Sequence, residues 1–251
     1  MLFSLWGDEA YRATRDADFL GSGDSGIDHL AGLFREVCGI HVEDDGLAFV
    51  EDSVQAEPIR DDMEYGGVRV TLQATLHGAR IPLQVDIGFG DVITPAANTI
   101  DYPTLLDSPA PRIRAYPRET VIAEKYQAMV NLGIANTRMK DFYDLRVLAR
   151  RFEFNGEILA TAIRNTFQRR GTQLPGSTPL PFTHEFYDDG QKNTQWRAFT
   201  QKGRLMETPP PLADVCKFLH SFLVPPTESL TQGTGFPMKW PMGGPWGART
   251  G

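Results

Sequence analysis

Cysteine is scarce in this sequence, and long runs of apolar residues are missing from it. Cys38 and Cys216 each fall within an apolar helical pattern, so we expect two buried small side chains rather than a disulfide or a thiolate metal site. No stretch approaches the roughly 20 consecutive apolar residues of a membrane-spanning helix. The opening residues have neither the basic start nor the apolar length of a signal peptide. We therefore expect a soluble, cytoplasmic protein that does not bind membranes.

Lysine is absent before Lys125, and arginine supplies all of the earlier positive charge. Residues 1–118 carry 20 acidic and 9 basic residues, a net charge of −11, whereas residues 119–251 carry 12 and 16, a net charge of +4. An acidic half suits metal binding, and a mildly basic half can meet a polyanion. Ordinary solvated surfaces also produce a difference of this size, so charge alone leaves both interpretations open.

The first half of the sequence has the pattern of strands around one helix. The expected elements are a strand over 14–20, a helix over 26–38, an extended segment over 47–59 and a strand pair over 68–76 and 81–90. A turn at residues 77–80 joins the strand pair. Strand alternation places Asp86 on the opposite face from Val85 and Ile87. This predicts a carboxylate on the polar side of a small sheet.

The second half has the longer period of helices. The expected helices cover 119–132, 138–152, 156–168, a short segment at Trp196 and Phe199, and 212–223. Residues 91–118 show no clear period and are interpreted as a crossover, with the domain boundary near residue 115. From Pro225 onward the sequence holds five prolines and six glycines, which predicts a loose tail. We expect the aromatic residues of this tail, Phe236, Trp240 and Trp246, to dock on the domain or on a partner.

Two aspartates, Asp16 and Asp18, occupy alternate positions of the first expected strand. Side chains two residues apart on a strand project from the same face, where two carboxylates can share a divalent cation. Such a pair also fits two solvated charges beside a turn. The position of Asp86 favours the metal-site interpretation, because a charged residue in an otherwise apolar strand indicates a specific role. Three carboxylates on adjacent strands are the arrangement that two-metal phosphoryl transfer requires.

Four segments together carry a resemblance to a known family. They are Arg12-Ala13-Thr14-Arg15-Asp16-Ala17-Asp18, Val85-Asp86-Ile87-Gly88-Phe89-Gly90, Ala123-Glu124-Lys125 and Arg138-Met139-Lys140-Asp141-Phe142-Tyr143-Asp144-Leu145. In combination they resemble the nucleotidyltransferases of the AbiEii/AbiGii toxin family, which belong to the DNA polymerase β-type nucleotidyltransferase superfamily. Later segments near Phe186, Phe199 and Val215 also resemble the helical part of these proteins, so the resemblance covers nearly the whole chain.

The resemblance implies an α/β (α+β) protein in three parts. Residues 1–115 would form a polymerase β-like catalytic domain with a small mixed sheet. Residues 116–224 would form a mainly helical domain that completes the site and binds RNA. Residues 225–251 would be the tail rich in proline and glycine.

The resemblance also implies the site residues. Asp16, Asp18 and Asp86 would bind Mg²⁺, and Lys125 would contact the phosphates of the nucleotide. Asp141 would complete the catalytic cluster. Two further residues would help to hold the nucleotide, Thr14 and Asp144. From the residues alone, Lys125 could instead pair with a neighbouring acid. Asp141 and Asp144 share a helix face, where such a pair is more often solvated.

A glycine motif is expected upstream of the two aspartates. Proteins of the superfamily carry a Gly-Gly or Gly-Ser pair there, at a helix N-terminus that holds the triphosphate. Residues 1–7 resemble the continuation of that helix, so the pair would fall before Met1, and Gly7 is too close to Asp16 to replace it. A shortened chain and a family member that binds nucleotide poorly are both open interpretations.

The expected reaction is Mg²⁺-dependent transfer of a nucleoside monophosphate from an NTP to an acceptor hydroxyl. The resemblance points to RNA as the acceptor, with tRNA as the leading candidate. It also points to a toxin of a toxin–antitoxin or phage abortive-infection system, with the antitoxin as a separate chain. Six arginines could line a groove for an RNA backbone or form an ordinary solvated surface: Arg146, Arg150, Arg151, Arg164, Arg169 and Arg170.

Two alternatives stand beside this function. A catalytically inactive family member would act as a nucleic-acid-binding or partner-binding module. A carboxylate-rich, metal-dependent phosphohydrolase would release phosphate without joining a nucleotide to an acceptor. Binding of NTP and metal would count against the first, and labelling of an acceptor would count against the second.

Overall fold

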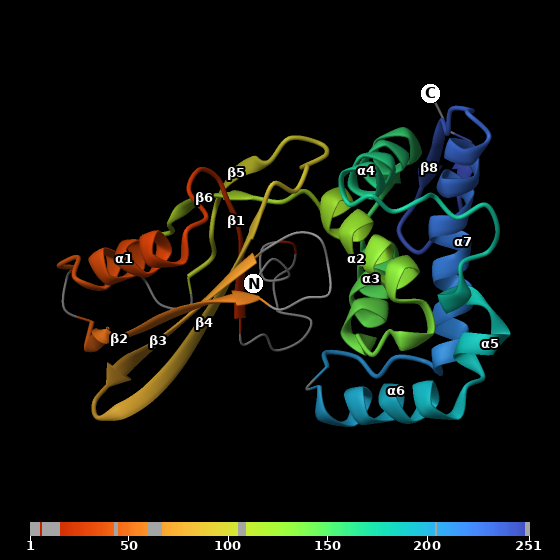
Figure 1. Cartoon of the computed structure of the whole chain (residues 1–251). Helices are drawn as coiled ribbons and strands as arrows, with labels where there is room; N and C mark the ends of the chain where they lie inside the picture. Colours follow the sequence, from red (N-terminus) through yellow and green to blue (C-terminus); the bar gives the residue numbers. More distant parts are fainter. Residues whose placement is uncertain are drawn as a thin grey trace. The chain divides into compact units, whose positions relative to one another are not determined.

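The computed structural model describes Trp6 and residues 16–42, 45–59, 67–104, 109–203 and 205–248 (Figure 1). The described residues form two compact units, one from residue 16 to 91 and one from 92 to 248 together with Trp6. Each unit has its own hydrophobic core. The expected division at residue 115, by contrast, concerns catalytic and RNA-binding parts and remains a prediction.

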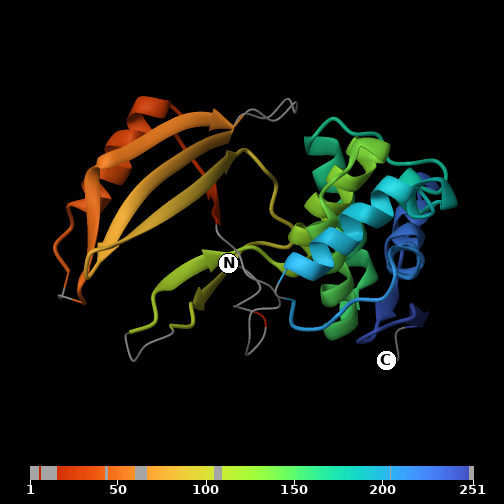
Figure 2. The same ribbon diagram turned by 90° about the horizontal axis from the view of Figure 1, so that it is seen from below.

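The first unit is a four-stranded mixed sheet with one helix packed against it (Figure 2). Its elements are β1 (Asp16–Gly21), α1 (Ile27–Cys38), β2 (Leu47–Ile59), β3 (Gly67–Leu76) and β4 (Ala79–Phe89). The strand order is β1-β4-β3-β2, with β1 parallel to β4 and the other two pairs antiparallel. The small mixed sheet expected from the sequence is confirmed.

Alternation of apolar and polar residues gives this sheet one covered and one polar face. The core between α1 and the sheet is made of Leu30, Ala31, Val54, Val68, Val70, Leu72, Val85 and Ile87. Side chains at the intervening strand positions, including Arg69 and Asp86, lie on the other face. Asp86 therefore lies opposite the face of Val85 and Ile87, as the alternation predicts.

A tight turn fixes the register of β3 against β4. His77 and Gly78 have φ values of 47° and 85°, and a two-residue hairpin turn of type I′ needs positive φ at both positions. The turn lies within the predicted segment 77–80. Across it Arg69 faces Asp86, and Thr71 faces Gln84. The turn thus determines which polar residues of the two strands become neighbours.

The second unit is mostly helical. Its helices are α2 (Arg118–Leu132), α3 (Met139–Arg151), α4 (Gly156–Arg169), α5 (His184–Tyr187), α6 (Gly190–Lys202) and α7 (Leu212–Thr231), with short 3₁₀ turns η2 (Gly133–Ala135) and η3 (Leu180–Phe182). Tyr126, Phe142 and Phe222 are among the side chains fully buried in its core. Gly133, with a φ of 50°, follows α2 where the sequence predicted its end. None of the helices in the described ranges is long and apolar enough to cross a membrane.

The segment interpreted from the sequence as a crossover, residues 91–118, contains a small hairpin. Strands β5 (Asn98–Asp101) and β6 (Arg112–Ala115) pair in antiparallel register, with Ile100 opposite Ile113. Strands of four residues are too short to give a readable alternation, which is why the sequence did not reveal them.

The expectations of a helix ending at residue 223 and of a loose tail after it are wrong. Helix α7 continues through Pro225 and Pro226 to Thr231. Beyond it, β8 (Met238–Trp240) and β9 (Gly247–Ala248) form a three-stranded sheet with β7 (Phe154–Asn155), which lies between α3 and α4 in the chain. Trp240 is buried and donates a hydrogen bond from Nε1 to the carbonyl of Ala149 at 2.6 Å. Aromatic anchoring therefore outweighs the proline and glycine content, and the tail aromatics dock on their own unit.

Candidate functional site

Three carboxylates meet on the polar face of the sheet in the first unit. Asp18 of β1 lies beside Asp86 of β4 in the parallel pair, and Asp16 lies two residues earlier on β1. One oxygen from each of the three carboxylates lies within 4.8 Å of the other two. In the part of the chain that the structure describes, no other group of three or more acidic, histidine or cysteine side chains is close enough to hold a metal. The structure thus brings together the three acids singled out from the sequence.

The donor set of this acidic cluster, Asp16, Asp18 and Asp86, suits a hard divalent cation. Carboxylate oxygens are the ligands that such cations prefer. Asp16 and Asp86 are half-buried and Asp18 is exposed, so the cluster remains accessible from the polar face of the sheet. Three negative charges this close repel one another unless a cation or a proton balances them. The residues therefore fit a metal, and the cluster is a candidate acidic metal site.

Arg69 is a member of the site that sequence reasoning missed. Its Nε donates to Asp86 Oδ1 at 2.8 Å and its Nη2 donates to Oδ2 at 2.7 Å, so the guanidinium grips both carboxylate oxygens. Gln84 Nε2 also donates to Asp86, at 3.2 and 3.4 Å. The hydrogen bond to Asp86 raises the pKa of Arg69, partial burial opposes it, and the charges of Asp86, Glu57 and Asp16 add to the rise.

A sequence signal for Arg69 did exist. Across a two-residue turn at His77 and Gly78, each residue of β3 pairs with the residue of β4 that lies equally far from the turn. Residue 69 is therefore the partner of residue 86. Alternation alone predicts only that both side chains share a face. The register, which depends on the length of the turn, is what identifies them as directly opposed.

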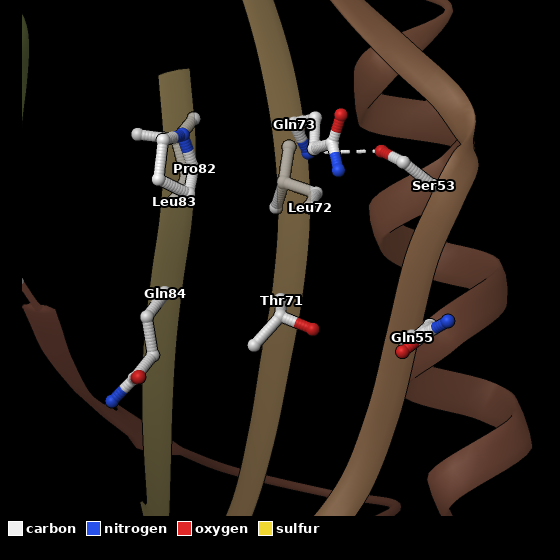
Figure 3. A pocket seen from close by; sticks show the side chains of 8 residues that line it. All are labelled: Ser53, Gln55, Thr71, Leu72, Gln73, Pro82, Leu83 and Gln84. Atoms are coloured by element: carbon white, nitrogen blue, oxygen red, sulfur yellow. Dashed lines mark hydrogen bonds between the residues drawn. The ribbon is translucent and has the colours of Figure 1, made fainter. Parts of the chain in front are cut away.

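A hollow lined by both polar and apolar side chains lies next to the acidic cluster, on strands β2, β3 and β4. Figure 3 shows Gln84, Thr71 and Gln55 on three neighbouring strands, and the register places Asp16 beside Gln84 in the same row. The hollow has a volume of about 720 Å³ and is lined by Ser53, Gln55, Thr71, Leu72, Gln73, Pro82, Leu83 and Gln84. None of these side chains is charged. The surface beside the acids can therefore donate and accept hydrogen bonds without attracting or repelling ions.

The second unit holds a separate cluster of charged residues around Lys125 of α2. Lys125 Nζ lies 2.5 Å from Asp141 Oδ1 and 3.0 Å from Asp144 Oδ2, both on α3. Arg138 Nε donates to the second oxygen of Asp141 at 2.6 Å. The side chains of Asp141 and Asp144 are only 1% exposed, which corrects the view that this pair is solvated. Lys125 is thus paired with acids, one of the two alternatives open from the sequence.

Electrostatics in this cluster favour the charged forms. Burial lowers the pKa of Lys125, but Asp141 and Asp144 outweigh burial and raise it to about 12. Burial likewise opposes ionisation of Asp141, but Lys125 and Arg138 outweigh it and lower its pKa. Lys125 and Asp141 therefore stay ionised near pH 7.

Other residues singled out from the sequence have different positions. Thr14 lies outside the described residues, as do Arg12, Arg15 and Gly7. Cys216 is buried, and burial raises its pKa to about 12, while Cys38 is half-buried; both cysteines are free. The expectation of two buried cysteines therefore holds for Cys216, whereas Cys38 is only partly covered.

The six arginines proposed to line an RNA groove do not form one exposed run. Arg146 is buried on α3 and donates to Glu207 at 2.8 Å. Arg170 is half-buried and contacts Gln127 at 3.1 Å. The other four are exposed: Arg150, Arg151, Arg164 and Arg169. The helical period of the sequence could not separate the inward-facing members from the outward-facing ones, because neighbouring elements cover different sides of α3 and α4.

Comparisons with known proteins agree with these observations. Residues 1–219 match the family described as nucleotidyl transferase AbiEii toxin, of type IV toxin–antitoxin systems. No curated protein is similar enough in sequence to count as a relative.

Two crystal structures from Helicobacter pylori share the fold. One is a candidate nucleotidyltransferase, with a TM-score of 0.51 and 16% identity, over 94% of this chain and 88% of that one. The other is JHP933, with a TM-score of 0.50 and 16% identity, over 92% of this chain and 86% of that one. Identity this low supports the fold alone. The match over residues 1–219 establishes more: the chain belongs to the AbiEii family, and is a nucleotidyltransferase enzyme, the toxin of a type IV toxin–antitoxin system.

Proposed function

We propose that this protein transfers a nucleoside monophosphate from an NTP to a hydroxyl group of an RNA, with tRNA as the leading candidate. The observation that carries the proposal is the acidic cluster, whose three carboxylates lie within 4.8 Å of one another in a chain of a nucleotidyltransferase family. In this reaction the acceptor hydroxyl loses its proton to water, and its oxygen forms a bond to the α-phosphorus. The bond from that phosphorus to the β-phosphate oxygen breaks, and pyrophosphate leaves.

Asp16, Asp18 and Asp86 would hold Mg²⁺ through their carboxylate oxygens. Bound Mg²⁺ would offset the negative charge of the phosphates and would activate the acceptor oxygen for its attack. The three side chains do no bond-making themselves: their part is to position charge on a rigid sheet beside the reacting groups. Their places on two adjacent strands support this role, because the register of β1 and β4 fixes them relative to one another.

We assign roles in the same reaction to Lys125, Asp141 and Asp144. The family match covers residues 1–219 and so includes the acidic cluster and the cluster around Lys125. Lys125 would contact a nucleotide phosphate, and Asp141 and Asp144 would hold its ammonium group in place beforehand. Thr14 is proposed as a further contact to the nucleotide, on the resemblance alone.

The hollow beside the acidic cluster supports an RNA acceptor. Its amide and hydroxyl side chains can bond to base edges and to ribose hydroxyls, which carry no charge. The exposed arginines of α3 and α4 would meet the phosphate backbone. Modification of the acceptor would account for toxicity, in a toxin–antitoxin or abortive-infection setting, and a separate antitoxin protein would counteract it.

The test is transfer of label from each α-labelled NTP in turn to total tRNA with Mg²⁺, using wild type and Asp16→Ala. We expect labelled RNA with one or more NTPs for wild type and none for Asp16→Ala. A parallel assay with γ-labelled NTP follows the leaving group. Free phosphate without labelled RNA would show a phosphohydrolase instead. Absence of both NTP–Mg²⁺ binding and labelled RNA would show an inactive module that binds nucleic acid or a partner.

A further inference from the structure

Arg69 and Asp86 form a directly opposed, bidentate ion pair in the first unit. They are directly opposed in the antiparallel pair of β3 and β4, and two hydrogen bonds of 2.8 and 2.7 Å join them. The Arg69 side chain is 35% exposed and that of Asp86 is 17% exposed, so the pair is only partly screened by water. A partly buried, bidentate pair of this kind fixes the rotation of the carboxylate as well as its charge.

The position of this pair matters because Asp86 is also a member of the acidic cluster. A divalent cation held by the cluster would approach a carboxylate whose two oxygens already accept bonds from Arg69. The guanidinium and the metal carry like charges, and their repulsion at a separation of a few ångströms is not fully screened. Arg69 therefore opposes metal binding while it aligns one of the ligands.

A second carboxylate is available to Arg69 on its other side. Glu57 of β2 is paired with Arg69 in the register, so the same row of the sheet reads Asp18, Asp86, Arg69, Glu57. Glu57 is exposed. A guanidinium displaced from Asp86 would thus move towards an acid rather than towards an uncharged surface. Arg69 thus has an acidic neighbour in both states: Asp86 when no metal is bound, and Glu57 when a metal displaces it from Asp86.

We propose that Arg69 is a positioning residue that occupies the cationic place beside Asp86 when no metal is bound. In that role it weakens the affinity of the cluster for divalent metal and holds Asp86 in the orientation that turnover needs. The proposal rests on the proposed metal site at Asp16, Asp18 and Asp86. It predicts that metal affinity and turnover respond in opposite directions when Arg69 is removed.

The experiment measures binding of Mn²⁺, as a probe, to the full-length protein by calorimetry without NTP. Arg69→Gln should tighten Mn²⁺ binding about fivefold or more, because a nearby positive charge is lost. The same variant should lower kcat for RNA labelling about tenfold with little change in KM for the NTP, because Asp86 is no longer aligned. Circular dichroism would confirm that the sheet is intact.

Two further variants separate this role from a general effect of charge. Arg80→Gln removes a positive charge from the same strand pair at an exposed position, six residues from Asp86 along β4. At about 20 Å that charge is screened, so Mn²⁺ affinity should change less than about twofold. Arg69→Lys keeps the charge and loses the fork, and should bind Mn²⁺ with an affinity between wild type and Arg69→Gln.

Unchanged or weaker Mn²⁺ binding by folded Arg69→Gln would overturn the proposal. If Arg69→Gln does not fold, Arg69→Lys decides, and binding weaker than wild type would overturn it. Absence of Mn²⁺ binding from wild type and Arg69→Gln alike would also overturn it, whether or not RNA is labelled. The proposed transfer reaction is judged separately by the label on RNA, so the two failures are distinguishable.

Discussion

Asparagine in place of Asp18 should slow nucleotide transfer by about a thousand-fold while the protein remains folded. The change removes one of three carboxylates that lie within 4.8 Å of one another. An amide of the same shape binds a divalent cation more weakly and supplies no charge to balance it. Asp18 is exposed, so the substitution costs little packing, and it relieves repulsion within the cluster. Initial rates of RNA labelling measure the effect.

Glu51→Gln is the matched control for this prediction. Glu51 is an exposed acid on β2 in the same unit, outside the acidic cluster, and its replacement removes the same charge. We expect its rate to stay within about twofold of wild type, since the effect of a distant exposed charge is screened. Asp18→Asn enzyme that labels RNA as fast as this control would exclude a metal role for Asp18.

Methionine in place of Lys125 should destabilise the second unit by about 3–5 kcal/mol. Methionine has a similar length but no charge, so it leaves Asp141 and Asp144 buried without the ammonium group that pairs with both. Arg138 still contacts Asp141, but Asp144 loses its contact with Lys125. Urea unfolding followed by tryptophan fluorescence reports on this unit, because Trp6, Trp196, Trp240 and Trp246 all belong to it.

Lys140→Met provides the comparison on the same structural unit. Lys140 is exposed on α3, next to Asp141 in sequence, and its loss should change stability by less than about 0.5 kcal/mol. Equal losses of stability in the two variants would show that the ion pairs of Lys125 contribute nothing. A large loss confined to Lys125→Met would establish that this lysine stabilises the unit in addition to any contact with nucleotide.

The free energy of unfolding should depend on pH through these ion pairs, with one limit in acid and one in alkali. The pKa of Asp141 is lowered in the folded protein, so its contribution is full above the pKa of about 3.9 of an unfolded aspartate and is lost as the pH falls below it. The pKa of Lys125 is raised to about 12, so its contribution is full below about 10.4 and is lost as the pH rises through 12. Unfolding by urea at a series of pH values measures both limits. Lys125→Met should lose the alkaline part of the dependence, and a wild-type alkaline profile in that variant would contradict the assignment.

The sheet and its acids were predictable because their information is local. Alternation over β3 and β4 determines which face carries Asp86, and the spacing of Asp16 and Asp18 puts them on one face of β1. The pairing of β1 with β4 joins distant segments, which alternation within a strand does not identify. Arg69 was within reach of the same reasoning once the two-residue turn had set the register.

The second unit was harder to predict because its important contacts depend on helix packing. The helical period located α2 and α3, but it did not show that Lys125 of one would face Asp141 and Asp144 of the other. The same holds for Pro225 and Pro226, which normally end a helix yet lie within α7. There, burial of the aromatic side chains that follow α7 favours continuation of the helix through both prolines. Local residue preferences do not reveal this burial. The strands of the β5–β6 hairpin were simply too short to recognise.

The parallel pairing of β1 with β4 has a consequence for the protein during its own synthesis. Two of the three clustered acids lie on β1, and β4, which brings the third, is made last of the four strands. At about 5–20 residues per second, a ribosome takes several seconds to reach β4 after releasing β1. For that interval the nascent toxin has no assembled set of carboxylates. The topology would therefore delay the proposed transfer reaction until the whole first unit has left the ribosome.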